Sequence, residues 1–175
     1  LEWMGRSYET GNGVGGIDYA KALEWYLKAD EQNSAYAQNG IGKIYYSGGY
    51  GVEQDYEKAV EWFRKAAEQG NTWSLYMMGF CNEYGQGTER NSEKAIEWYQ
   101  KAADLGNEQA QEALKKAAEK KQINEWIDLG TKAYEKENYG EAVEYFKKAA
   151  EQNNVTGLEW MGYCYQQGKG VEDID

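Results

Sequence analysis

Small and hydrophobic side chains recur along this chain at helical spacing. Between residues 75 and 82 they stand at i, i+3, i+4 and i+7, with Asn82 in the last place, and Val60, Phe63, Ala66 and Ala67 also recur at helical spacing. This periodicity is typical of helices that bury one face and expose the other. The stretches predict two kinds of amphipathic helix that alternate along the chain. Residues 75–82 belong to the first helix of a pair, here named helix A, and residues 60–67 belong to the second helix of the preceding pair, here named helix B.

The predicted pair is repeated several times. Helix B contains an alanine followed by an aromatic pair and then Lys-Ala, and the central alanines stand 37, 36 and 47 residues apart, at Ala22, Ala59, Ala95 and Ala142. Helix A contains a glycine that follows Met, Ile or Leu, at Gly5, Gly42, Gly79, Gly130 and Gly162. Internal repeats of this length are the sequence signature of solenoid proteins, in which stacked helix pairs bury a shared core.

The segments between the helices contain the expected turn residues. A Gly-rich bend follows helix A in four copies, as in Gly85-Gln86-Gly87, and glycine permits the left-handed conformation that ends a helix. Asp55, Asn91 or Ser92 then stands where helix B needs an N-cap. We expect the small residues of both helices, such as Gly42 and Ala59, to let the two helices approach closely.

These motifs resemble the Sel-1-like repeat (SLR), whose signature is L-G-x-x-Y-x-x-G-x-G-V followed by D-x-x-K-A-x-x-W-Y-x-K-A-A-x-x-G-N. In the first copy the matching residues are Gly5, Tyr8, Gly11, Gly13, Val14, Asp18, Ala22, Trp25 and Tyr26. The second copy matches with one inserted residue, and the third has Asn82 and Thr88 in the Tyr and Val places. With this resemblance we predict an all-α fold, a right-handed superhelical α-solenoid of helix-turn-helix repeats.

One unit resembles the related tetratricopeptide repeat (TPR) instead, because its helices are joined by residues 137–139 without the Gly-rich bend. Before it, residues 108–121 predict one extra helix that has Lys115 where the glycine is expected, and we interpret it as a spacer or cap. The predicted units are 1–34 (helix A truncated), 35–71, 72–107, the extra helix 108–121, the TPR-like unit 122–154, and a half repeat, 155–175. Because both ends expose unpaired helices, we expect a fragment of a longer array, able to associate end to end with other copies.

Charge and composition narrow the range of functions. The formal net charge is −11, from 19 Lys and Arg against 30 Asp and Glu, which argues against nucleic acid as a partner. No hydrophobic run approaches a membrane span, so we predict no membrane insertion. The chain has no His and only two Cys, Cys81 and Cys164, which excludes His-based triads and a structural zinc site made by this chain alone. We predict no metal or cofactor, and we expect both thiols to be buried.

The resemblance implies that helix A lines a concave face that holds partners. Residues 73, 76, 80 and 84 form a second, aromatic stripe on helix A, offset from the core stripe, and neighbouring units add aromatic, Asn, Lys and Arg side chains. We predict that a peptide contacts Arg6, Tyr36, Asn39, Lys43, Tyr46, Trp73, Tyr76, Phe80, Tyr84, Tyr134 and Tyr163. The alternative is that these rings pack between adjacent units.

We therefore predict a protein-interaction scaffold or adaptor rather than an enzyme. Two alternatives stay open: a carboxylate-based hydrolase, since Asp and Glu are plentiful, and a spacer attached to a catalytic domain outside this sequence. The sparse Cys usage favours a cytoplasmic location, whereas proteins of the resembled family also occur in secreted and cell-envelope settings.

Overall fold

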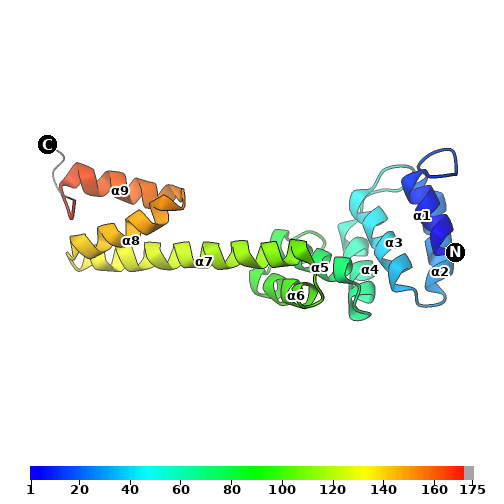
Figure 1. The fold of residues 1–175 in the computed structure, drawn as a ribbon. Helices are drawn as coiled ribbons and strands as arrows, with labels where there is room; N and C mark the ends of the chain where they lie inside the picture. Colours follow the sequence, from blue (N-terminus) through cyan, green and yellow to red (C-terminus); the bar gives the residue numbers. More distant parts are fainter. Residues whose placement is uncertain (172–175) are drawn as a thin grey trace. The chain divides into compact units, whose positions relative to one another are not determined.

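A computed structural model describes residues 1–171 of the chain, and the regular elements of this part are helices (Figure 1). An isolated bridge between Gly49 and Val52 is the exception in the described residues. The helices are α1 (Glu2–Thr10), α2 (Tyr19–Asp30), α3 (Ala35–Ser47), α4 (Tyr56–Glu68), α5 (Thr72–Tyr84), α6 (Ser92–Asp104), α7 (Glu108–Glu135), α8 (Tyr139–Glu151) and α9 (Val155–Gln167). The predicted all-α solenoid of helical hairpins is confirmed.

The chain divides into two compact units, Leu1–Leu114 and the part from Lys115 onward. In the first unit, α1 packs on α2, α3 on α4 and α5 on α6, and each hairpin packs on the next through α2–α3 and α4–α5 (Figure 1). In the second unit α8 packs on α9. In the first unit, neighbouring hairpins therefore bury hydrophobic sides against each other, as expected of stacked repeats.

The recurring helix A glycine explains how closely each hairpin closes. A Cβ built at Gly42 would lie 2.6 Å from Phe63 Cδ1, and one at Gly79 would lie 2.5 Å from Tyr99 Cδ1. The ring of helix B lies directly on the glycine backbone of helix A, so any side chain at that place would overlap the ring. The same contact joins Gly5 to Tyr26 in the first hairpin and Gly130 to Phe146 in the second unit.

The ends of the helices agree with the predicted turn chemistry. The side chains of Asp18, Asp55 and Asn91 each accept a hydrogen bond from the backbone N–H three residues later, at 2.9–3.0 Å, and so cap α2, α4 and α6. Gly85 ends α5 with φ 71°, a left-handed conformation that glycine adopts without steric cost. The predicted caps and bends are thus confirmed where the helix pairs begin and end.

One predicted helix boundary is wrong. The sequence predicted a separate helix over 108–121, followed by a new helix in the TPR-like unit, but α7 runs without a break from Glu108 to Glu135. No glycine occurs between Gly106 and Gly130, the chain has no proline, and the intervening residues are mostly good helix formers. Nothing in the local sequence therefore stops the helix, although residues 115–125 bury no side chain.

Candidate partner-binding surface

The predicted aromatic stripe exists as a continuous row of rings along α5. Ring centroids are 5.4 Å apart from Trp73 to Tyr76, 6.3 Å from Tyr76 to Phe80, and 4.5 Å from Phe80 to Tyr84. The two ends of the row are open, with Trp73 39% and Tyr84 58% exposed. Tyr76 is half-buried and also contacts Tyr99 at 5.6 Å, so its ring packs inside the repeat as well. The row therefore combines packing with accessible ring surface.

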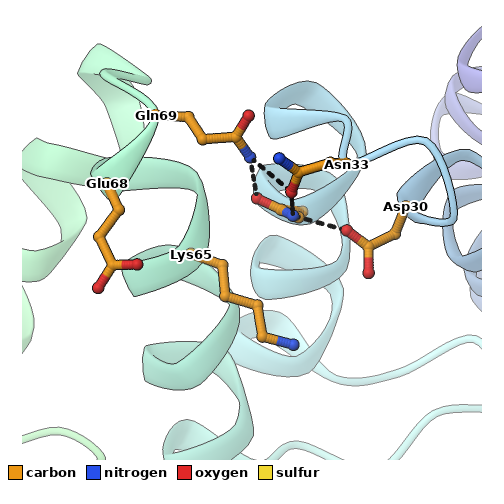
Figure 2. A pocket seen from close by; sticks show the side chains of 6 residues that line it. Asp30, Asn33, Lys65, Glu68 and Gln69 are labelled. Atoms are coloured by element: carbon orange, nitrogen blue, oxygen red, sulfur yellow. Dashed lines mark hydrogen bonds between the residues drawn. The ribbon is translucent and has the colours of Figure 1, made fainter.

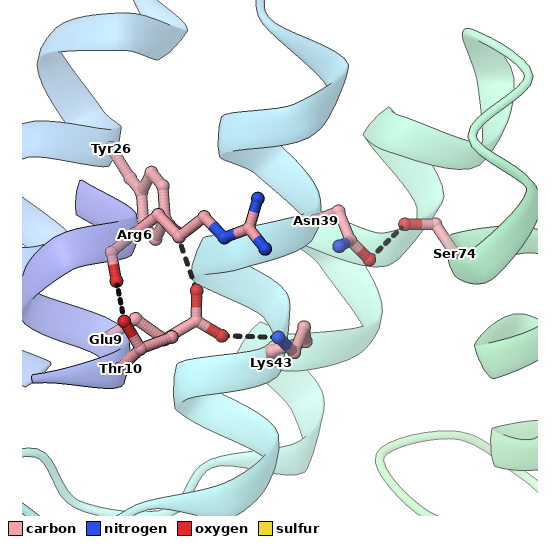
Figure 3. Close-up of polar contacts among 7 residues, drawn as sticks. All are labelled: Arg6, Glu9, Thr10, Tyr26, Asn39, Lys43 and Ser74. Carbon is pink, nitrogen blue, oxygen red and sulfur yellow. Dashed lines mark hydrogen bonds and ion pairs between the residues drawn. The ribbon is translucent and has the colours of Figure 1, made fainter. Parts of the chain in front are cut away.

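Two polar residues of the predicted surface are engaged by other repeats (Figure 3). The Lys43 ammonium donates to the Glu9 carboxylate of α1 and forms an ion pair with it. Asn39 Oδ1 accepts a hydrogen bond of 2.9 Å from Ser74 Oγ of α5. Both contacts join the helix A of one repeat to the helix A of the next. Lys43 and Asn39 thus help to hold neighbouring hairpins together.

The other predicted residues of the first unit divide in the same way. Tyr46 donates to Gln86 Oε1 at 2.6 Å and packs against Tyr56 and Phe63, with centroids at 5.2 and 6.3 Å, so it too bridges adjacent repeats. Burial raises the pKa of its hydroxyl. Tyr36 is 39% exposed, with its ring 6.2 Å from Tyr26, and Arg6 is exposed, its guanidinium 5.8 Å from the Trp3 ring.

A hydrogen-bonded tyrosine–carboxylate pair recurs between helix A and helix B. Tyr26 donates to Glu9 at 2.6 Å, and Tyr99 donates to Glu83 at 2.7 Å, and both acidic residues stand four positions after the helix A glycine. Burial, and secondarily the hydrogen-bonded carboxylate, raises the pKa of each tyrosine well above its ordinary value. Glu9 therefore serves both Tyr26 and Lys43, which ties helix B of the first repeat to helix A of the second (Figure 3).

A polar pocket of about 330 Å³ lies where α2, α3 and α4 meet (Figure 2). Gln38, only 3% exposed, donates to Asp30 at 2.6 Å and to Asn33 at 3.1 Å, and it accepts from Gln69 at 2.7 Å. These groups satisfy one another across two repeats, so the network explains how a glutamine is accommodated at a core position.

The second unit brings together two predicted residues and two that sequence reasoning missed. Tyr134 of α7 and Tyr163 of α9 line a cavity of about 380 Å³ together with Glu159 and Trp160. Aligning the repeats on their glycines would have found Glu159, because it stands three residues before Gly162, as Asn39 and Tyr76 do before Gly42 and Gly79. Trp160 lies next to it and stacks on Phe146 with centroids 4.7 Å apart.

The described residues also bear on metal binding, membrane insertion and thiol chemistry. Within 1–171, no group of three or more His, Cys, Asp or Glu side chains is placed to hold a metal ion, and no helix is long and hydrophobic enough to cross a membrane. Cys81 and Cys164 are free and buried, as predicted, and burial raises the pKa of the Cys81 thiol to about 12. The acidic residues 172, 173 and 175 lie outside the described residues.

Comparison with known families gives a match over most of the chain. A model described as "Sel1 repeat" matches residues 2–34, 35–71, 74–107, 128–154 and 157–174. The fourth match falls in the unit whose linker resembles the TPR family. A protein of Helicobacter pylori strain J99 with the name "Putative beta-lactamase HcpE" is 37% identical over 51 residues, which are 29% of this chain and 14% of that protein.

Solved structures of similar proteins share the fold. A Sel1 repeat protein from Oxalobacter formigenes is 30% identical, with a TM-score of 0.56 over 99% of this chain and 64% of that chain. The protective antigen c5321 from uropathogenic Escherichia coli, which displays an SLR fold, is 26% identical, with a TM-score of 0.50 over 98% of this chain and 49% of its own. Helicobacter pylori cysteine rich protein B is 26% identical, with a TM-score of 0.53 over 64% of this chain and 90% of its own. This chain thus spans less than two thirds of the length of the Oxalobacter formigenes protein, of c5321 and of HcpE.

Proposed function

Because the chain belongs to the Sel1 repeat family, whose members generally mediate protein–protein interactions, we propose that it is an interaction module that holds a peptide segment of a partner on its helix A surface. The observation that carries this proposal is the row of rings on α5, which ends in the accessible side chains of Trp73 and Tyr84. Rings of this kind provide a large contact area and lose little conformational freedom on binding.

The charge of the chain indicates which segments it favours. A net charge of −11 attracts basic segments and repels acidic ones. Lys43 and Asn39 are engaged between repeats, so they are poorly placed to hold a partner carboxylate. We therefore propose an extended segment with basic and hydrophobic residues, whose hydrophobic side chains contact the α5 rings.

The test is selection of binding peptides from a displayed random library on the whole chain, followed by fluorescence anisotropy with variants. We expect Tyr84→Ala to weaken the selected peptides about tenfold or more, as for an accessible aromatic anchor. Tyr50→Ala is the matched control, because this tyrosine is also exposed, at 59%, but lies in the loop after α3. Equal losses in both variants, or no selected peptide that depends on Tyr84, would contradict the proposal.

A catalytic role is the competing class, favoured by the name of the Helicobacter pylori relative. A beta-lactam hydrolase needs an activated nucleophile or a metal-bound water, and this chain has no His and buries both thiols. We propose that the chain is not an enzyme and expect no turnover of a chromogenic beta-lactam above the buffer rate. Hydrolysis that disappears after a single Glu→Gln change would support the enzyme instead.

A further inference from the structure

The cavity between α7 and α9 of the second unit has the composition of a cation-binding site. It is an open pocket of about 380 Å³, lined by Tyr134, Glu159, Trp160 and Tyr163. Three of these four residues are aromatic and one is acidic. A space of this size accepts one side chain of a partner rather than a folded element.

The three rings stand close together and are inclined to one another. The Tyr134 centroid is 5.3 Å from that of Trp160 and 6.0 Å from that of Tyr163, at interplanar angles of 53° and 51°. Trp160 and Tyr163 meet edge to face at 5.8 Å and 84°. Because the faces of aromatic rings are electron-rich, rings grouped in this way attract ammonium groups, including those of lysine and quaternary amines.

The charges around the cavity favour a cation. Among the described residues, the lining contributes the carboxylate of Glu159 and no basic side chain. The ammonium of Lys169 donates to Tyr139 Oη at 3.0 Å and lies 4.5 Å from the Tyr139 centroid and 5.3 Å from that of Tyr134. Tyr134 therefore already contacts a cation of this chain, whereas Glu159, Trp160 and Tyr163 form the part of the lining that a partner cation can contact.

The first unit contains a lysine in the corresponding place. Between the first and second repeats, the position after the helix A glycine is Lys43, and its ammonium binds Glu9, four residues after the preceding glycine. In the second unit these two positions are Tyr163 and Tyr134. The first junction thus pairs Lys43 with Glu9, whereas in the second unit the ammonium of Lys169 lies over the Tyr134 ring and the carboxylate of Glu159 lines the open pocket.

We propose that this cavity binds the lysine side chain of a protein partner. The ammonium lies against Glu159 and the ring faces, and the alkyl stem lies against Trp160. The proposal rests on the proposed function and narrows it, because it names the partner group that the second unit recognises. The rings contribute a cation–π attraction and the carboxylate contributes a charge-assisted hydrogen bond.

The test uses small probes and the whole chain labelled with ¹⁵N. Nα-acetyl-lysine-N-methylamide carries the ammonium, and Nα-acetyl-norleucine-N-methylamide is its neutral counterpart. In NMR titrations we expect the lysine probe to shift the resonances of Glu159, Trp160 and Tyr163 saturably, about fivefold more tightly than the norleucine probe. Equal affinity for the two probes, or shifts that map elsewhere, would overturn the proposal.

Two variants separate the carboxylate from general effects of charge. Glu159→Gln keeps the size of the side chain and should abolish most of the preference for the lysine probe, whereas Glu144→Gln, an exposed position on α8, should retain it. An unchanged preference in Glu159→Gln also contradicts the proposal. If peptides selected on the α5 rings still bind while the lysine probe does not, only the cavity proposal fails. If the probe binds while no peptide depends on Tyr84, the proposed α5 surface fails instead.

Discussion

Gly79 of α5 and Gly162 of α9 occupy the same place in the repeat but have opposite surroundings. A Cβ at Gly79 would lie 2.5 Å from the Tyr99 ring, whereas a Cβ at Gly162 would find no atom of the described residues within 4 Å. The leucine four residues before each glycine differs in the same way, because Leu75 is 4% exposed and Leu158 is 52% exposed. The difference shows that a helix A pattern becomes a core only where a helix B lies against it.

The contrast extends to the junctions between successive A helices. Lys43 and Glu9 close the first junction with an ion pair, and Tyr46 with Gln86 closes another. At the junction of α7 and α9, rings and Glu159 line a cavity instead. Variants that compare closed and open positions test these interpretations most directly.

The largest effect is expected from removing a ring that covers a glycine. Phe63 is fully buried on Gly42, so Phe63→Ala should lower the free energy of unfolding by about 3–5 kcal/mol. Tyr163→Ala removes a ring that is 44% exposed on α9 and contacts only Trp160 and Tyr134 among the rings of the described residues, so it should lower this free energy by about 0.5–1.5 kcal/mol. Urea unfolding followed by circular dichroism measures both. Similar losses in the two variants would show that α9 is as closely packed as α4.

A smaller effect is expected at the two glycines themselves. Gly79→Ala forces a methyl group into the Tyr99 ring and should cost about 1–3 kcal/mol of unfolding free energy. Gly162→Ala meets no such contact and should gain up to about 1 kcal/mol, because alanine favours the helix. Thermal and urea unfolding of the two variants decide the sign. A destabilised Gly162→Ala variant would indicate that this face of α9 is covered in solution.

The hydroxyl of Tyr99 should contribute less than its ring. Tyr99→Phe removes the hydrogen bond to Glu83 and should cost about 0.5–1.5 kcal/mol at neutral pH. Because the pKa of Tyr99 is raised in the native state, the unfolded chain releases this proton first as pH rises above the ordinary value of 10.0. The contribution of Tyr99 to stability is therefore complete below that pH and is lost above it.

Unfolding free energies of the wild type and of Tyr99→Phe, measured from neutral pH to about pH 11, test this linkage. The variant should lose less stability over the alkaline part of the range than the wild type does. Parallel curves for the two proteins would mean that Tyr99 does not retain its proton in the folded state.

The smallest effect is expected at the partly exposed ion pair of Lys43 and Glu9. Lys43 is 44% exposed in its side chain, so solvent screens its attraction to Glu9, and Lys43→Met should cost about 0.2–1 kcal/mol of unfolding free energy at low salt. Molar salt should remove most of the difference from wild type, because it screens the pair. Lys147→Met, at an exposed position in α8, is the control and should have no comparable salt dependence.

Much of the fold was predictable because the repeat carries its own local instructions. The helix A glycines, the N-caps Asp55 and Asn91 and the Gly-rich bend after α5 act over a few residues, and the structure has them where they were predicted. The continuity of α7 did not follow from the repeat pattern, because that pattern places a boundary between two units near residue 122. No residue near 122 can stop a helix, and helix propensity decided the outcome.

The sequence by itself determined the helical pairs, the small residues that let them approach closely and the aromatic row on α5, since each follows from spacing along the chain. Only the tertiary structure decided which side chains remain available, because this depends on partners about 35 residues away in the chain, as Lys43 from Glu9 and Asn39 from Ser74. Stacking of hairpins pairs some polar residues with each other and so leaves them less available to a partner. Packing of α9 near α7 places Glu159 and Trp160 beside Tyr134 in a cavity whose lining comes from more than one helix.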